Sequence, residues 1–214
     1  MVNLTHPELK ETQVPDLPPA SLDTLRKLRE DACASSSAYD FKLQSQQRFL
    51  RRVLSPDSPT QNLLMVHGTG TGKTCTAIQI AEEYILRPEF QDKRVLVLAN
   101  PAVQDNFRTQ IFDISRVSVD ADGLLLSKQC TGRRYLDILQ RAQAQPLRWT
   151  DQSQREKLMN MANRILNEFY EFQGYTSFGN RITDVQLEKR EADMDAWIHD
   201  TFDNRLIIVD EAHN

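Results

Sequence analysis

The chain has 214 residues, of which 40% are hydrophobic and 26% are charged, so it is long and apolar enough to bury a core. No apolar run approaches the roughly 20 residues that are needed to cross a bilayer, so we expect no membrane partner. The net charge of −4 shows no overall excess of basic residues, and any nucleic-acid binding must therefore depend on a local surface.

The first 20 residues contain several prolines and few large apolar side chains, which predicts a loose arm, and residues 21–32 have the pattern of a short helix. The N-terminus lacks the basic and apolar segments of a signal peptide, so we expect a protein that is not secreted. Cys33, Cys75 and Cys130 are widely scattered. We predict that they form neither a metal site nor a disulfide framework, as in a reducing compartment.

The next elements alternate between helix and strand. Residues 43–54 have a helical apolar pattern with basic residues on the outer side, and the apolar run at 63–66 predicts a short buried strand. A glycine-rich loop follows, and then a helix is expected over 73–87, a buried strand over 94–100 and a helix over 102–114. This order indicates an α/β fold with a parallel sheet and flanking helices.

The middle of the chain is less regular. Residues 123–139 combine a short strand pattern with a helical one. An amphipathic helix is predicted over 154–172, with Phe169 and Phe172 on its apolar face, and another helix over 184–198. Residues 205–209 then form a third apolar run, which predicts a buried strand that leads into an acidic turn.

The sequence GTGTGKT at residues 68–74 follows a predicted strand and precedes a predicted helix. Glycines let backbone N–H groups approach an anion, and the start of a helix adds its positive dipole end. In such a loop Lys73 would reach the β- and γ-phosphates and the Thr74 hydroxyl would bind Mg²⁺. The strict form of this motif has glycine at position 67, where this chain has His67. A glycine-rich turn that binds nothing is the alternative.

The sequence LIIVDEAHN at the end of the chain places Asp210 and Glu211 directly after an apolar strand. The carboxyl ends of parallel strands face the crevice in which ligands bind. At that edge Asp210 could hold Mg²⁺, and Glu211 could orient and deprotonate an attacking water. A solvated strand end is the alternative for this motif.

The motifs GTGTGKT and VDEAH together resemble motifs I and II of superfamily 2 helicases, specifically the Asp-Glu-Ala-His class. This resemblance implies a RecA-like P-loop lobe over residues 41–214, with a helical insertion at about 120–203 and the arm at 1–40 outside it. It implies ATP and Mg²⁺ as cofactors, which the loop residues and the two carboxylates would hold. By the same resemblance, the segment LQSQQRFLRRVLS places Gln47 as the residue that reads adenine. The implied phosphate-binding residues are Gly68, Thr69, Gly70, Thr71, Gly72, Lys73 and Thr74.

The segments QCTGRRYLDIL and FYEFQGYTSF are also similar to those of helicases from large cytoplasmic DNA viruses, among them the helicase-like small subunit of the poxvirus early transcription factor. The resemblance implies nucleic acid as a partner, DNA in preference to RNA, and viral RNA polymerase or transcription-factor subunits as further partners. It places the protein in the virion or the host cytoplasm.

Superfamily 2 motors use two lobes with ATP between them, and residues 41–214 correspond to most of the first lobe. We therefore expect this chain to bind nucleotide but to hydrolyse it poorly. Two other functions remain open: a P-loop ATPase that does not act on nucleic acid, and a non-catalytic subunit that uses nucleotide as a structural clamp in a transcription complex.

Overall fold

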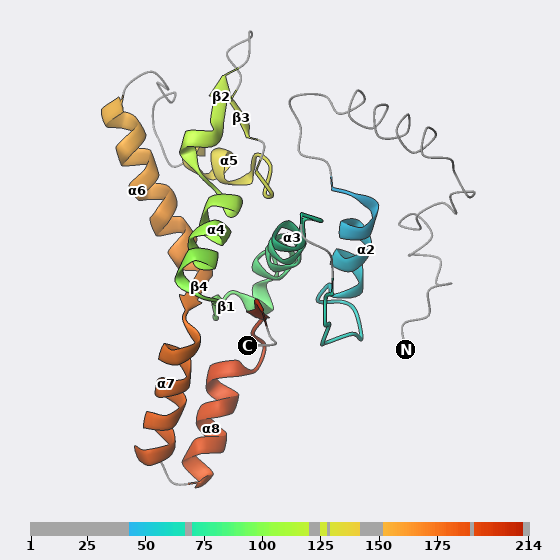
Figure 1. The fold of residues 1–214 in the computed structure, drawn as a ribbon, viewed down its shortest axis with the longest axis vertical. Helices are drawn as coiled ribbons and strands as arrows, with labels where there is room; N and C mark the ends of the chain where they lie inside the picture. Colours follow the sequence, from blue (N-terminus) through green and yellow to red (C-terminus); the bar gives the residue numbers. More distant parts are fainter. Residues whose placement is uncertain are drawn as a thin grey trace, which may run out of the picture.

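The computed structural model describes residues 43–66, 70–119, 125–127, 129–141, 152–188 and 191–211. The arm predicted at 1–20 and the helix predicted at 21–32 lie outside these residues. A parallel sheet flanked by helices forms the centre of the molecule, and the helices α7 (Tyr175–Glu188) and α8 (Glu191–Phe202) extend from it as a hairpin (Figure 1). The predicted α/β fold is confirmed.

The main sheet has three parallel strands in the order β4 (Tyr170–Gln173), β1 (Val95–Leu98) and β5 (Ile207–Val209). Leu98 of β1 lies opposite Gln173 on one side and opposite Val209 on the other. All three strands therefore end at the same edge of the sheet, and the residues that follow β4 and β5 meet there.

The central strand β1 is buried along its whole length, as expected for an aliphatic run with a neighbour on each side. The prediction that residues 205–209 contain a third strand is correct, but the prediction that this strand is buried is wrong. Ile207 is 39% exposed and Val209 is 46% exposed. In the part of the chain that the structure describes, β5 pairs with β1 alone and forms an edge of the sheet.

The prediction of a buried strand over residues 63–66 is also wrong. These residues belong to no strand, and Leu64 is 79% exposed and Val66 is 81% exposed. An apolar run is buried in a sheet only where a neighbouring strand satisfies its backbone groups. The described part of the chain provides no such neighbour for residues 63–66, because they do not pair with the edge strand β5.

The three helices predicted around the first two apolar runs are confirmed as α2 (Ser45–Val53), α3 (Lys73–Ile85) and α4 (Pro101–Ile111). At the start of α4 the Asn100 side chain accepts a hydrogen bond from the Val103 N–H at 3.0 Å, and Pro101 occupies the first turn. The helix α3 lies between α2 and α4 and packs against both (Figure 1).

The segment between α4 and β5 is not wholly helical. The short 3-10 turn η3 (Ile114–Arg116) leads into β2 (Val117–Val119), which pairs antiparallel with β3 (Leu125–Ser127). The helix α5 (Arg134–Arg141) follows. Residues 123–139 thus contain both the strand and the helix that their pattern suggested.

The helix predicted over 154–172 is too long at its C-terminal end. The helix α6 (Gln152–Phe169) stops where β4 begins, so Phe172 lies in a strand. Tyr170, the first residue of β4, is 1% exposed. Apolar spacing alone does not separate the last turn of a helix from a short strand, and here the pairing with β1 decides.

The scattered cysteines were predicted to form no disulfide framework, but one pair is joined, because Cys75 is bonded to Cys130. Their Cα atoms are 5.2 Å apart and 55 residues separate them along the chain. The bond joins the first turn of α3 to the loop before α5. Such a pairing has no local sequence signature, because only the packing of α3 beside that loop brings the two residues together.

Within the described residues, no helix has the length and apolar character needed to cross a membrane.

Candidate functional site

The glycine-rich loop enters α3 through two left-handed backbone positions. Gly70 has φ +76° and Gly72 has φ +82°, a conformation that residues with a side chain rarely adopt. A Cβ atom on Gly72 would also lie 2.7 Å from Nε2 of Gln47, but this is the end of a flexible side chain, so the positive φ is the main reason for glycine here. Thr71 lies between these glycines, whereas His67, Gly68 and Thr69 lie outside the described residues.

The N-terminus of α3 can hold an anion. The first turn carries no acidic side chain, and no side chain caps the helix at Gly72. The first N–H groups of a helix have no partner within it and carry its positive dipole end. An anionic group at this end of α3 would meet backbone donors together with the side chains of Lys73 and Thr74.

A cavity of about 580 Å³ brings the two sequence motifs together. Lys73 and Thr74 of α3 line it, as do Asp210 and Glu211 at the end of β5. Most of the remaining wall is apolar and comes from residues 63–66 and from β5. The four residues that the motifs singled out for phosphate and metal chemistry therefore share one site.

The two carboxylates lie close enough to influence each other. Burial raises the pKa of Asp210, the negative charge of Glu211 raises it further, and the positive charge of Lys73 opposes both effects. Glu211 has φ +53°, which shows that the chain turns sharply directly after Asp210. A cation at this edge would therefore be attracted to a concentrated negative charge.

The donor set fits Mg²⁺ only if a further ligand supplies oxygens. Mg²⁺ prefers hard oxygen ligands in octahedral geometry and is commonly bound by one or two protein side chains together with substrate phosphates. Thr74 and Asp210 offer a hydroxyl and a carboxylate. No group of three or more His, Cys, Asp or Glu side chains in the described residues could hold a metal ion by itself. This arrangement suits a Mg²⁺–nucleotide better than a bare ion.

Gln47 is held against the glycine-rich loop. It is 4% exposed, its Oε1 accepts a hydrogen bond from the Gln44 N–H at 3.0 Å, and its Nε2 donates to the Gly72 carbonyl at 3.3 Å. An amide side chain has two donor hydrogens and an oxygen with two lone pairs. Each end of Gln47 therefore keeps capacity for one more bond, as an adenine contact would require.

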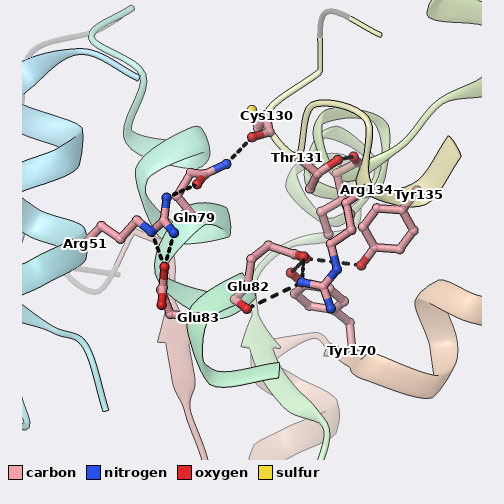
Figure 2. A network of polar contacts seen from close by, with 10 residues as sticks. Arg51, Gln79, Glu82, Glu83, Cys130, Thr131, Arg134, Tyr135 and Tyr170 are labelled. Carbon is pink, nitrogen blue, oxygen red and sulfur yellow. Dashed lines mark hydrogen bonds and ion pairs between the residues drawn. The ribbon is translucent and has the colours of Figure 1, made fainter. Parts of the chain in front are cut away.

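A buried polar network on α3 was not foreseen from the sequence (Figure 2). The Glu82 carboxylate forms an ion pair with Arg134 and accepts hydrogen bonds from the hydroxyls of Tyr135 at 3.1 Å and Tyr170 at 2.6 Å. Burial raises the pKa of Glu82, and Arg134 and the two tyrosines oppose this effect. The network connects α3 to α5 and β4.

The opposite side of α3 is tied to α2. Arg51 forms an ion pair with Glu83 and donates a hydrogen bond to Gln79 at 3.3 Å, and Gln79 donates to the Cys130 carbonyl (Figure 2). Residues on both sides of α3 thus restrain the helix that carries Lys73 and Thr74. The sequence did not reveal that polar residues of α3 restrain the helix, because a charged residue on a helix is usually exposed to solvent.

Tyr175, the first residue of α7, does not line the cavity. Burial raises the pKa of its phenol, and the charges of Asp210 and Glu211 raise it further.

Comparison with known proteins gives a family match for most of the chain. The sequence model of the family described as "Type III restriction enzyme, res subunit" matches residues 41–214. A protein of Acanthamoeba polyphaga mimivirus named as a "Putative ATP-dependent RNA helicase" is 28% identical over 90% of this chain and 16% of its own length. A second mimivirus protein with the same type of name is 25% identical over 83% of this chain and 25% of its own length.

A protein of Invertebrate iridescent virus 3 named as a "Putative helicase" is 25% identical over 78% of this chain and 14% of its own length. The chain thus spans a quarter or less of the length of these three relatives. No solved structure matches it at a significant level.

Proposed function

Because the chain belongs to the family of the type III restriction enzyme res subunit, we propose that it is the ATP-binding lobe of an ATP-dependent DNA helicase or translocase. The single observation that carries this proposal is the shared cavity. It joins Lys73 and Thr74 at the start of α3 to Asp210 and Glu211 at the end of β5.

Each of these groups has a distinct role in the proposed reaction. Lys73 and the backbone amides of the loop bind the β- and γ-phosphates of ATP, and Thr74 and Asp210 hold Mg²⁺. When bound, Mg²⁺ neutralises charge that develops on the phosphate oxygens. Glu211 orients the attacking water and accepts its proton, and Gln47 reads the adenine edge.

The proposal is tested by titrating the chain with a fluorescent ATP analogue and Mg²⁺. We expect saturable binding that the Lys73→Ala variant weakens at least 10-fold, because the lysine supplies a point charge to the phosphates. Lys93→Ala is the matched control, since Lys93 donates to the carbonyls of His199 and Asp203 and does not line the cavity. A folded wild-type chain that binds no nucleotide, or equal affinity in Lys73→Ala, would contradict the proposal.

Nucleic acid is the proposed partner of the lobe. The names of two relatives refer to RNA helicases and that of the family to a restriction enzyme, so both nucleic acids belong in the test. We expect ATP hydrolysis by the whole protein to increase when DNA is added, and to increase less with RNA. Hydrolysis that neither nucleic acid stimulates would favour a P-loop ATPase that does not act on nucleic acid.

The proposed biological setting is viral early transcription, with RNA polymerase or transcription-factor subunits as partners. This part of the proposal is supported by the likeness to viral helicases alone. A nucleotide-clamped subunit without catalysis is the other candidate in that setting, and the Glu211→Gln substitution separates the two.

A further inference from the structure

The disulfide between Cys75 and Cys130 lies directly beside the proposed phosphate-binding residues. Cys75 follows Lys73 and Thr74 in the first turn of α3. Cys130 lies in the loop between β3 and α5. The bond therefore links the start of the helix that carries the phosphate-binding residues to a segment that is 55 residues further along the chain.

The loop that carries Cys130 is also held by contacts that do not involve the disulfide. The Cys130 N–H donates to the Gln110 carbonyl at 3.1 Å. The Gln129 side chain accepts a hydrogen bond from the Asp113 N–H and donates to the Asp113 carbonyl. These contacts tie the loop to the C-terminal end of α4 and its following residues, and they remain when the two sulfur atoms are separated.

The helix α3 makes a further contact with the same loop. Cys75 and Gln79 are four residues apart and therefore lie on one side of the helix. Gln79 donates a hydrogen bond to the Cys130 carbonyl (Figure 2). This contact keeps α3 and the loop adjacent without the disulfide. The two Cα atoms are 5.2 Å apart, a separation at which the bond forms without movement of the backbone. The geometry therefore suits a bond that can be broken and formed again.

The two sides of the bond differ in exposure. Cys75 is partly buried, whereas Cys130 is 1% exposed, so the Cys75 side is the more accessible one. In cytosolic proteins disulfides are usually transient and serve catalysis or redox sensing. In the host cytoplasm, the setting that the viral resemblance implies, this bond would exchange with small-molecule thiols.

We propose that the Cys75–Cys130 pair is a reversible redox switch of nucleotide binding. The disulfide form holds the first turn of α3 in the arrangement that binds phosphate. The dithiol form binds nucleotide more weakly, because the first turn gains conformational freedom that binding must remove again. This inference rests on the proposed function, since nucleotide is the ligand that the switch controls.

The reductant is a small-molecule thiol, RSH. Its sulfur attacks Sγ of Cys75, the S–S bond breaks, and Cys130 leaves with the electron pair and takes up the proton. A second RSH attacks the mixed disulfide on Cys75, so that RSSR forms and Cys75 is released as a thiol. Two thiols are thereby oxidised to one disulfide while the disulfide of the protein is reduced to two thiols.

The test compares the two redox forms of one protein. The Cys33→Ser chain contains no cysteines other than the pair, so a thiol assay identifies each form. We expect reduction with dithiothreitol to weaken binding of the fluorescent ATP analogue and Mg²⁺ about 5-fold, and re-oxidation to restore it. Cys130→Ala in the same background is the control, and it should bind as weakly as the reduced chain and not respond to dithiothreitol. Equal affinity of the two redox forms, or a response of Cys130→Ala, would overturn the inference.

Three further measurements separate a switch from a structural bond. The reduced chain should keep its circular dichroism spectrum, and unfolding on reduction would overturn the inference. By linkage, saturating nucleotide should shift the equilibrium of the pair with glutathione toward the disulfide by the same factor of about 5, and an unchanged equilibrium would overturn it. Without nucleotide, amide hydrogen exchange in the first turn of α3 should be faster in the dithiol form, and equal exchange would also overturn it. A folded, oxidised chain that binds no nucleotide would instead overturn the proposed function.

Discussion

Replacing Glu82 with alanine is expected to lower the free energy of unfolding by about 3–5 kcal/mol. Glu82 is 7% exposed and pairs with Arg134, whose side chain is 22% exposed. Removal of one partner from a buried ion pair leaves the other charge without compensation. The hydroxyls of Tyr135 and Tyr170 would also lose the oxygen that accepts their hydrogen bonds.

The adjacent residue provides a matched control. Glu83 also belongs to α3 and also forms an ion pair, but its partner Arg51 has a side chain that is 38% exposed. Glu83→Ala should therefore cost no more than about 1 kcal/mol. Since the two substitutions change helix propensity equally, chemical denaturation of both variants isolates the buried network. Equal losses in the two variants would contradict a special role for Glu82.

The same network predicts a pH dependence. Burial raises the pKa of Glu82 above its ordinary value of 4.5, so the native protein takes up this proton at a higher pH than the unfolded chain does. The stability contributed by this protonation is fully present below pH 4.5 and is lost as the pH rises through the folded pKa. Denaturation at several pH values should show the gap between wild type and Glu82→Ala widening as the pH falls from neutrality.

The sequence was most informative where the residue types of a short motif indicate a function directly. GTGTGKT and VDEAH specify glycines with positive φ, a lysine, a hydroxyl and two carboxylates, and the described parts of both motifs line or adjoin one cavity. The helices α2, α3 and α4 were also predictable, because their boundaries have local signals such as Asn100 and Pro101 before α4.

The wrong structural predictions concern segments whose conformation depends on residues that are distant in the sequence but close in space. The run at 63–66 has the composition of a strand but has no partner strand among the described residues. Residues 170–172 were predicted to be helical but belong to a strand that pairs with β1. The Glu82 network and the Cys75–Cys130 bond join residues that are more than 50 positions apart.

The largest effect on catalysis is expected from Glu211→Gln. Glutamine keeps the size of the side chain and an acceptor oxygen but cannot take a proton from the attacking water. Because general-base catalysis contributes about 10²–10⁴-fold, the rate of single-turnover ATP hydrolysis by the whole protein should fall by that order. Binding of the fluorescent ATP analogue should be retained, since Lys73, Thr74 and the loop amides are unchanged.

Two further variants serve as comparisons for Glu211→Gln. Glu89→Gln, in the short turn η2 (Pro88–Phe90), changes a carboxylate that does not line the cavity and should leave the rate unaltered. Asp210→Asn should instead weaken the dependence of nucleotide binding on Mg²⁺, because this carboxylate is the proposed metal ligand. If wild type and Glu211→Gln bind nucleotide equally and neither hydrolyses it, even in the whole protein with DNA, the site is a structural clamp. A rate that depends on Glu211 would instead support its role as the general base of ATP hydrolysis.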